Sequence, residues 1–221
     1  MHDAMPDMAL ERRFGGLDRL YGKPGAARIR AAHVAVVGVG GVGSWAAEAL
    51  ARSGVGKLTL IDLDHVAESN INRQIHALDE TVGQAKVQAM RDRIERIHPG
   101  CQVHCIEEFV EPGNWPGILP QGVNAVIDAC DQVPAKTAMA VWARASQAMF
   151  ITVGAAGGKR LAHKVDVDDL SLVTHDPPSG PIALPLAQAP WRAAGRKEDA
   201  RALRLQPRGS GAARCILCCT G

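Results

Sequence analysis

Short runs rich in apolar residues alternate along the chain with segments in which apolar residues recur every three or four positions. The runs are four to six residues long, which predicts strands, and they lie at 33–37, 57–61, 102–106, 123–127, 150–153 and 162–167. The periodic segments predict helices, as does the N-terminal stretch, and they lie at 7–32, 44–53, 83–98 and 134–148. Strands that alternate with helices predict an α/β fold, with a mostly parallel sheet that carries helices on both faces and whose last strands can be antiparallel.

The first strand leads into a turn rich in glycine. Gly38, Gly40 and Gly43 lack a Cβ atom, so the chain there can turn tightly, approach a phosphate and pack the next helix on the strand. The helix that follows directs its N-terminal N–H groups and the positive end of its dipole toward the same point. Asp62 ends the second strand nineteen residues after Gly43, where a carboxylate can bind ribose hydroxyls. The sequence therefore predicts a Rossmann-like nucleotide site, and the turn alone does not choose the nucleotide.

The helix at 44–53 is expected to follow this turn directly and to end at Gly54. Its Trp45 and Ala49 side chains are expected to face the sheet. A long polar segment then follows the second strand and is expected to form a loop near the nucleotide.

Several charged and amide side chains are expected near the carboxyl ends of the strands, where ligands bind in open parallel sheets. Asn70 and Arg73 lie in the polar loop, and Lys86 lies in the first turn of the helix at 83–98. A cation is unfavourable at that end of a helix, so either an anionic ligand lies nearby or Lys86 is a surface lysine. Asp128 and Asp131 follow a buried strand and can either bind a hydrated metal with phosphates or cap the next helix.

Composition narrows the class of protein. The 221 residues carry a net charge of +2 and only eight aromatic side chains, which argues against a dedicated nucleic-acid-binding protein. The acidic N-terminus argues against a signal peptide, and no apolar run is long enough to span a membrane. The six cysteines are therefore interpreted as reduced thiols of a cytoplasmic protein. Cys130 is expected to be a buried small residue rather than a reactive thiol.

The chain is expected to divide into an N-terminal helical segment (1–32), a nucleotide-binding domain (33–176) and an atypical tail (177–221). The tail holds six of the thirteen prolines and seven basic residues against two acidic ones. No strand or helix period is visible after residue 178, so we expect either a disordered segment or the product of a shifted reading frame. Its one Cys-x-x-Cys pair, Cys215 and Cys218, lacks the second pair that a four-thiolate zinc site requires.

Taken together, the motifs resemble the ubiquitin-activating-enzyme-like superfamily of ATP-dependent adenylating enzymes and, within it, the tRNA threonylcarbamoyladenosine dehydratase family. The resemblance covers about residues 10–176 and rests on Arg13, Phe14, Gly15, Gly16, Gly38, Gly40, Gly41, Gly43, Asp62, Asp64, Asn70, Asn72, Arg73, Gln74, Lys86, Asp128 and Asp131. It implies ATP as the nucleotide, with the turn of Gly38, Gly40, Gly41 and Gly43 facing it and Asp62 at the ribose. It also implies that Asn70, Arg73 and Lys86 hold the phosphates and that Asp131 binds magnesium. Arg13 matches the arginine that such homodimers insert into the partner's site.

By this resemblance the substrate is tRNA that carries threonylcarbamoyladenosine. Its carboxylate is adenylated, with Arg13, Arg73, Lys86 and Asp131 as the catalytic residues, and the adenylate then cyclises with loss of AMP. A cysteine desulfurase with its sulfur acceptor is a further implied partner. Three alternatives stay open: an adenylyltransferase for the C-terminal glycine of a ubiquitin-like sulfur carrier, an NAD-dependent oxidoreductase, and a catalytically inactive nucleotide-binding protein.

Overall fold

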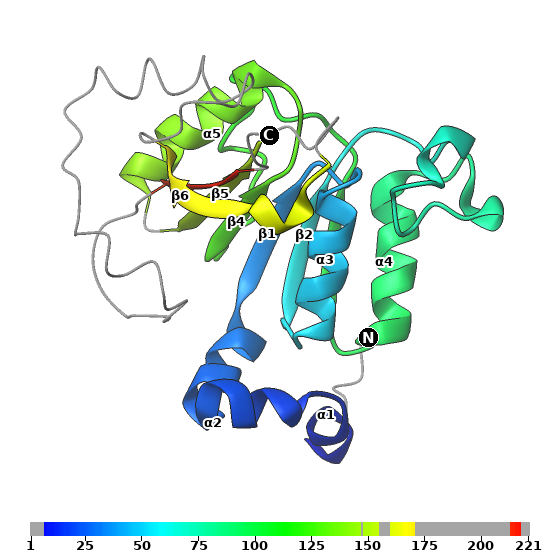
Figure 1. The fold of residues 1–221 in the computed structure, drawn as a ribbon, viewed down its shortest axis with the longest axis vertical. Coiled ribbons are helices and arrows are strands. Elements are labelled where there is room, and N and C mark those ends of the chain that lie inside the picture. The colour runs from blue at the N-terminus through cyan, green and yellow to red at the C-terminus, as the bar shows by residue number, and fades with distance from the viewer. Residues whose placement is uncertain (1–6, 147, 155–159, 171–212, 218–221) are drawn as a thin grey trace.

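The structure, a computed structural model, describes residues 7–146, 148–154, 160–170 and 213–217. Its centre is a seven-stranded sheet in the order β3-β2-β1-β4-β5-β7-β6 (Figure 1). The strands are β1 (His33–Val37), β2 (Lys57–Ile61), β3 (Gln102–Ile106), β4 (Ala125–Asp128), β5 (Met149–Val153), β6 (Asp166–Asp169) and β7 (Ala213–Leu217). The helices are α1 (Asp7–Phe14), α2 (Gly16–Ala31), α3 (Gly43–Arg52), α4 (Lys86–Ile97) and α5 (Val133–Ala145). Three single 3₁₀ turns lie at Glu68–Asn70, Asp79–Thr81 and Ala162–Lys164.

The sheet is parallel from β3 to β7, and only β6 runs antiparallel, against β7. This confirms the predicted α/β class, including the antiparallel end. After β1 the chain adds β2 and β3 on one side and then crosses to β4 on the other. The strand order therefore reverses between β1 and β4, and ligands of open α/β sheets bind in the crevice at such a switch point.

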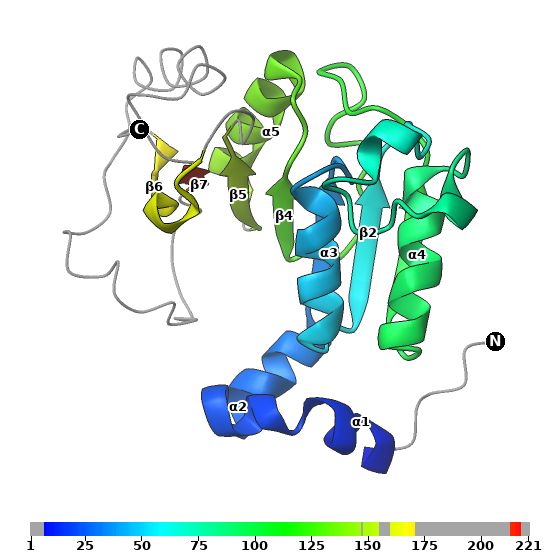
Figure 2. The ribbon, with the colours of Figure 1, turned by 45° about the vertical axis from the view of Figure 1, so that its right-hand side comes forward.

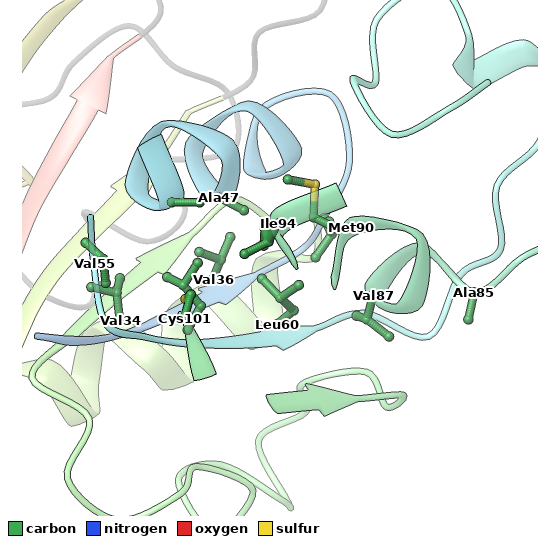
Figure 3. Close-up of a cluster of buried hydrophobic side chains, with 13 residues drawn as sticks. Val34, Val36, Ala47, Val55, Leu60, Ala85, Val87, Met90, Ile94 and Cys101 are labelled. Carbon is green, nitrogen blue, oxygen red and sulfur yellow. The ribbon is translucent and has the colours of Figure 1, made fainter. Parts of the chain in front are cut away.

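Alternating side chains of β1 build a core on each face of the sheet. Val34 and Val36 pack with the buried faces of α3 and α4, including Ala47 and Met90 (Figure 3). Ala35 and Val37 belong to the opposite cluster, which contains the buried face of α5 and the Trp115 ring. Because successive strand residues point to opposite faces, an unbroken apolar run such as β1 requires cover on both. The predicted helices on both faces are thereby confirmed (Figure 2).

The predicted inward face of α3 is wrong. Trp45 is 52% exposed and Ala49 is exposed, whereas Ala47, Glu48 and Ala51 are buried. Small side chains let the helix lie close to the sheet beside the glycine turn. Glu48 takes an inward position because its carboxylate accepts hydrogen bonds from two arginines, Arg52 Nε at 2.7 Å and Arg93 Nε from α4.

Two predictions near the end of the sheet also need correction. The strand expected at 162–167 begins with a 3₁₀ turn at Ala162–Lys164 instead, and β6 starts four residues and ends two residues later than predicted. No strand was expected after residue 178, yet β7 lies between β5 and β6 and pairs with both. The local sequence pattern does not predict β7, because this strand forms through hydrogen bonds to strands that are distant in sequence. The rest of the tail, including Cys218, lies outside the described residues, and the proposed division of the chain stays a prediction.

The N-terminal helices lie below the sheet, at the amino ends of the parallel strands (Figure 2). The chain breaks helical geometry at Gly22, whose φ is 70°, so α2 is kinked. Phe14 anchors α1: its buried ring meets the His98 ring edge-on, with centroids 4.6 Å apart. None of the helices in the described ranges is both long and apolar enough to cross a membrane.

Candidate functional site

A cavity of about 770 Å³ opens at the carboxyl ends of β1, β2 and β4, at the switch point of the sheet. Its volume is in the range of small-molecule sites. Most of the candidate residues line it, together with residues that were not expected there. The lining includes Gly38, Gly40, Gly41, Asp62, Asp64, Asn70, Arg73, Gln74, Lys86, Glu108, Phe109, Val110, Cys130, Asp131 and Lys136.

The glycine turn forms the floor of this cavity, and two of its glycines leave no room for a side chain. Gly38 has a φ of 82°, and a Cβ atom on it would lie 2.8 Å from the carbonyl oxygen of Ala129. A Cβ on Gly43 would overlap the carbonyl oxygen of Gly38. Gly43 is the first residue of α3 and is absent from the cavity lining, so its role is to let the helix start close to the turn. The N-terminus of α3 therefore lies beside the cavity, where the positive end of its dipole favours an anion.

Asp62 is buried and held by the backbone. Its Oδ2 accepts a hydrogen bond from the Val39 N–H at 2.6 Å, and its Oδ1 accepts one from the Asp64 N–H at 2.9 Å. Burial raises the pKa of Asp62, while these two hydrogen bonds and the charge of Lys86 oppose the rise. The carboxylate is thus oriented before any ligand binds.

Lys86 belongs to the site and is not a surface lysine. Its side chain is 8% exposed, and its Nζ donates to Asp64 Oδ2 at 2.7 Å. The Lys86 N–H also donates to the Asp64 carbonyl at 2.9 Å, which fixes the start of α4 against the end of β2. The carboxylate of Asp64 offsets the unfavourable helix dipole, and an anionic ligand in the cavity would do the same.

Arg73 and Asn70 come from the loop between β2 and α4. Arg73 is exposed, and its Nη1 donates to the Ser69 carbonyl at 2.7 Å and to Asn72 Oδ1 at 2.9 Å. A Cβ on Gly41 would lie 3.5 Å from Arg73 Cδ, so the arginine lies over the glycine turn. Asn70 is buried, and its Oδ1 accepts from the Ala67 N–H at 3.1 Å, which shapes the loop.

The two carboxylates after β4 have different roles. Asp128 is fully buried, and both of its oxygens accept hydrogen bonds within the protein. Asp131 is exposed and lines the cavity. The described residues include no group of three or more carboxylate, histidine or cysteine side chains able to hold a metal. A single carboxylate suits magnesium that takes its other ligands from phosphates and water.

Several lining residues were not predicted from the sequence, and Gln74 and Lys136 are two of them. Gln74 is 5% exposed, and no donor among the described residues reaches its Oε1. The sequence signal for Gln74 was its place beside Arg73 among the residues that carry the family resemblance. Lys136 lies in α5, where the sequence pattern offers no reason to distinguish it from a solvent-exposed lysine.

The Cys130 thiol lines the cavity but is not activated. Burial and the nearby Asp128 carboxylate raise the pKa of Cys130 to about 12, and its Sγ lies 3.1 Å from Asp128 Oδ1. A thiol with this pKa stays protonated at neutral pH, and the thiolate is the nucleophilic form. The expected unreactive thiol fits this environment, although Cys130 is only partly buried rather than buried as expected.

Arg13 does not join the cavity of its own chain. Its Nη1 donates to the Ile97 carbonyl at 2.8 Å, at the C-terminal end of α4. Lys86 lies at the opposite end of the same helix, and eleven residues of α helix span roughly 16 Å. An arginine at this place can reach a site of this kind only on another molecule.

His76, in the loop after Gln74, should make stability depend on pH. Burial, together with the charges of Lys86 and Arg93, lowers the pKa of His76 to about 4. The unfolded chain, with a pKa near 6.5, therefore binds more protons, so stability falls as pH drops from 6.5 toward 4. Between pH 7.5 and 5 we expect wild type to lose on the order of 2 kcal/mol more than His76→Gln, measured by urea unfolding. Parallel pH curves for the two proteins would contradict this assignment.

Comparison with known proteins places the chain among described relatives. A family model described as the ThiF family matches residues 14–168. The tRNA threonylcarbamoyladenosine dehydratase of Haemophilus influenzae is 44% identical over 167 residues, which are 76% of this chain and 64% of that protein. The enzyme of the same name from Escherichia coli K12 is 46% identical over 169 residues, which are 76% of this chain and 63% of that protein. This chain therefore spans slightly less than two thirds of the length of these relatives.

A solved structure extends the likeness to the fold. The E. coli tRNA N6-threonylcarbamoyladenosine dehydratase in complex with ATP matches with a TM-score of 0.83 and 38% sequence identity. The match covers 98% of this chain and 84% of that chain.

Proposed function

Since this chain belongs to the ThiF family, we propose that it uses ATP to dehydrate threonylcarbamoyladenosine in tRNA to its cyclic form. The observation that carries the proposal is the joint placement of Lys86, Arg73 and Asp131 around the glycine turn in one cavity. Two relatives with 44% and 46% identity bear the name of this dehydratase, and one solved relative is in complex with ATP.

In this proposal different residues of the cavity bind different parts of the nucleotide. The phosphates lie over the turn of Gly38 to Gly43, where N–H groups, Lys86 and Arg73 meet their charge. Asp62 accepts hydrogen bonds from the ribose hydroxyls at the end of β2. Asp131 would hold magnesium together with the phosphates, and the metal would neutralise charge on their oxygens.

The reaction then needs charge stabilisation more than protein nucleophiles. A carboxylate oxygen of the substrate attacks the α-phosphorus in line with the leaving pyrophosphate, and an acyl adenylate forms. An atom of the same substrate next attacks the activated carbonyl, the C–O bond to AMP breaks, and the ring closes. Lys86 and Arg73 stabilise negative charge that spreads over phosphate oxygens in the first step. The protonated Cys130 thiol takes no part in either step.

The partners follow from the same proposal. The substrate is tRNA that carries threonylcarbamoyladenosine, and the enzyme acts as a homodimer in which Arg13 enters the partner's cavity. The basic residues around Arg13 would then lie beside a site where tRNA binds. The cysteine desulfurase pair and the cytoplasmic location stay predictions.

The test is AMP release by the purified protein with tRNA that does or does not carry threonylcarbamoyladenosine. We expect AMP in an amount equal to the cyclic nucleoside formed, and only with the modified tRNA. Pyrophosphate exchange that depends on a ubiquitin-like sulfur carrier would instead support the adenylyltransferase. A folded protein that binds ATP and never releases AMP would support the inactive binding protein. Calorimetric titration of ATP against NAD tests the oxidoreductase alternative, which gives Arg73 and Lys86 no role.

A further inference from the structure

At the border of the cavity, three buried polar side chains from α5, β4 and β5 contact one another. Lys136 is 3% exposed, and its Nζ donates to Asp128 Oδ2 at 3.1 Å and to Thr152 Oγ1 at 3.3 Å. It also donates to the Val153 carbonyl at 2.9 Å. Thr152 donates its hydroxyl hydrogen to Asp128 Oδ2 at 2.6 Å. Residues Lys136, Asp128 and Thr152 are called the buried triad below.

The buried triad has no group left for a ligand. An ammonium group has three donors, and Lys136 uses them on three acceptors. Oδ2 of Asp128 accepts from Lys136 and Thr152, and Oδ1 accepts from the Cys130 N–H at 3.2 Å. Lys136 thus borders the cavity without directing its charge into it. Any effect of the triad on a ligand must pass through the chain that it holds.

That chain is the turn at 129–131, which ends in the exposed Asp131. Oδ1 of Asp128 holds the turn from one side through the Cys130 N–H. The Ala129 N–H donates to the Val37 carbonyl at 2.8 Å, which holds it against the end of β1. Ala129 and Cys130 also lie close to Gly38 of the glycine turn. The position of Asp131 relative to the glycine turn therefore depends on Asp128, and that of Asp128 on Lys136 and Thr152.

Stability alone does not account for an ion pair at this place. The neighbouring buried positions of α5 are apolar, among them Ala135, Met139 and Ala140. Replacing a buried ion pair with well-packed apolar residues is often neutral or stabilising, because removing two charges from water is costly. Side chains that do not bind a metal themselves but orient its ligand, in contrast, affect metal affinity strongly.

We propose that the buried triad of Lys136, Asp128 and Thr152 positions Asp131 for magnesium in the nucleotide site. This inference rests on the proposed function, in which Asp131 is the magnesium ligand. Lys136 and Thr152 are positioning residues, since neither contacts the nucleotide.

Thr152→Val tests the proposal with a small change of shape, because it removes only the hydroxyl that links Lys136 to Asp128. The control is Thr137→Val in α5, outside the cavity lining, whose hydroxyl donates to the Val133 carbonyl at 2.9 Å within its own helix. ATP binding is measured by calorimetry across a magnesium titration and in EDTA, and folding by thermal unfolding. For Thr152→Val we expect the half-saturating magnesium concentration to rise by about tenfold or more. ATP affinity in EDTA should stay within about twofold of wild type, and Thr152→Ser should restore the magnesium dependence.

Three results would overturn the inference. The first is a folded Thr152→Val protein with the magnesium dependence of wild type. The second is an equal loss of ATP affinity with and without magnesium, which indicates general damage to the cavity. The third is wild-type ATP binding that is insensitive to magnesium. A wild-type protein that binds ATP in a magnesium-dependent way but releases no AMP would refute the proposed function and leave this inference standing.

Discussion

Replacing Lys86 with methionine is expected to lower the rate of AMP formation by at least about a hundredfold. The ammonium group is buried at the cavity wall, 2.7 Å from the Asp64 carboxylate, and Asp62 lies beside it. Methionine keeps most of the side-chain volume, so the change removes the charge with little change of shape. The carboxylates of Asp62 and Asp64 would then face the phosphates without this cation. Phosphate charge would then be repelled by the wall that now attracts it.

The rate is best measured as single-turnover AMP formation from labelled ATP with modified tRNA. Lys57→Met is a matched control, because Lys57 begins β2 at the end of the strand that lies away from the cavity. It should retain nearly the full rate. A Lys86→Met protein that folds and forms AMP as fast as the control would refute the phosphate role of Lys86.

Local sequence pattern was sufficient for the part of the fold that lines the cavity. The apolar runs of β1 and β2, the glycines between them and the repeat of α4 are each read within a dozen residues. The structure places these predicted elements together because parallel strands end at one edge. Gly38, Asp62, Arg73 and Asp131 consequently line one cavity although they are distant in sequence.

Elements whose places depend on distant partners were not predictable in this way. An apolar repeat favoured Trp45 as an inward residue, but Glu48 is inward because Arg93 of α4 neutralises it. The indole of Trp45 instead donates to the Arg73 carbonyl at 2.9 Å. Strand β7 forms where β5 and β6 offer hydrogen-bonding edges on both sides, which no window of the tail reveals.

The same limit applies to charged residues in the site. Nothing in the sequence decides whether Lys86 is buried, because the answer depends on Asp64 at the end of another element. Lys136 is still less visible, since its partners Asp128 and Thr152 come from two strands. Buried cations are recognisable only when the fold shows which carboxylates and carbonyls surround them.

Arg13 offers the most direct test of the proposed homodimer, through mixing of two inactive variants. Its place at the far end of α4 from Lys86 means that each complete site would need Arg13 of one subunit and Lys86 of the other. Arg13→Ala and Lys86→Met should each lose at least about a hundredfold in AMP formation. Each variant alone lacks the same group in both sites, so neither homodimer contains a complete site.

A heterodimer of the two variants, however, has one site with Lys86 intact and Arg13 intact on the partner. Exchange of subunits between the native dimers, or coexpression of the two chains, gives about half heterodimers by random pairing. Each heterodimer has one complete site out of its two. The mixture should therefore recover roughly a quarter of the wild-type rate.

The control is a mixture of Lys86→Met with Arg73→Ala, which distinguishes residues that serve one chain's cavity from residues that serve the partner's cavity. Both of these residues line the cavity of a single chain, so each cavity of the heterodimer lacks one of them. No complete site forms, and this mixture should stay inactive. Absence of recovery with Arg13→Ala would show that Arg13 does not act across a dimer. Recovery in the control would show that Lys86 and Arg73 do not serve the same site.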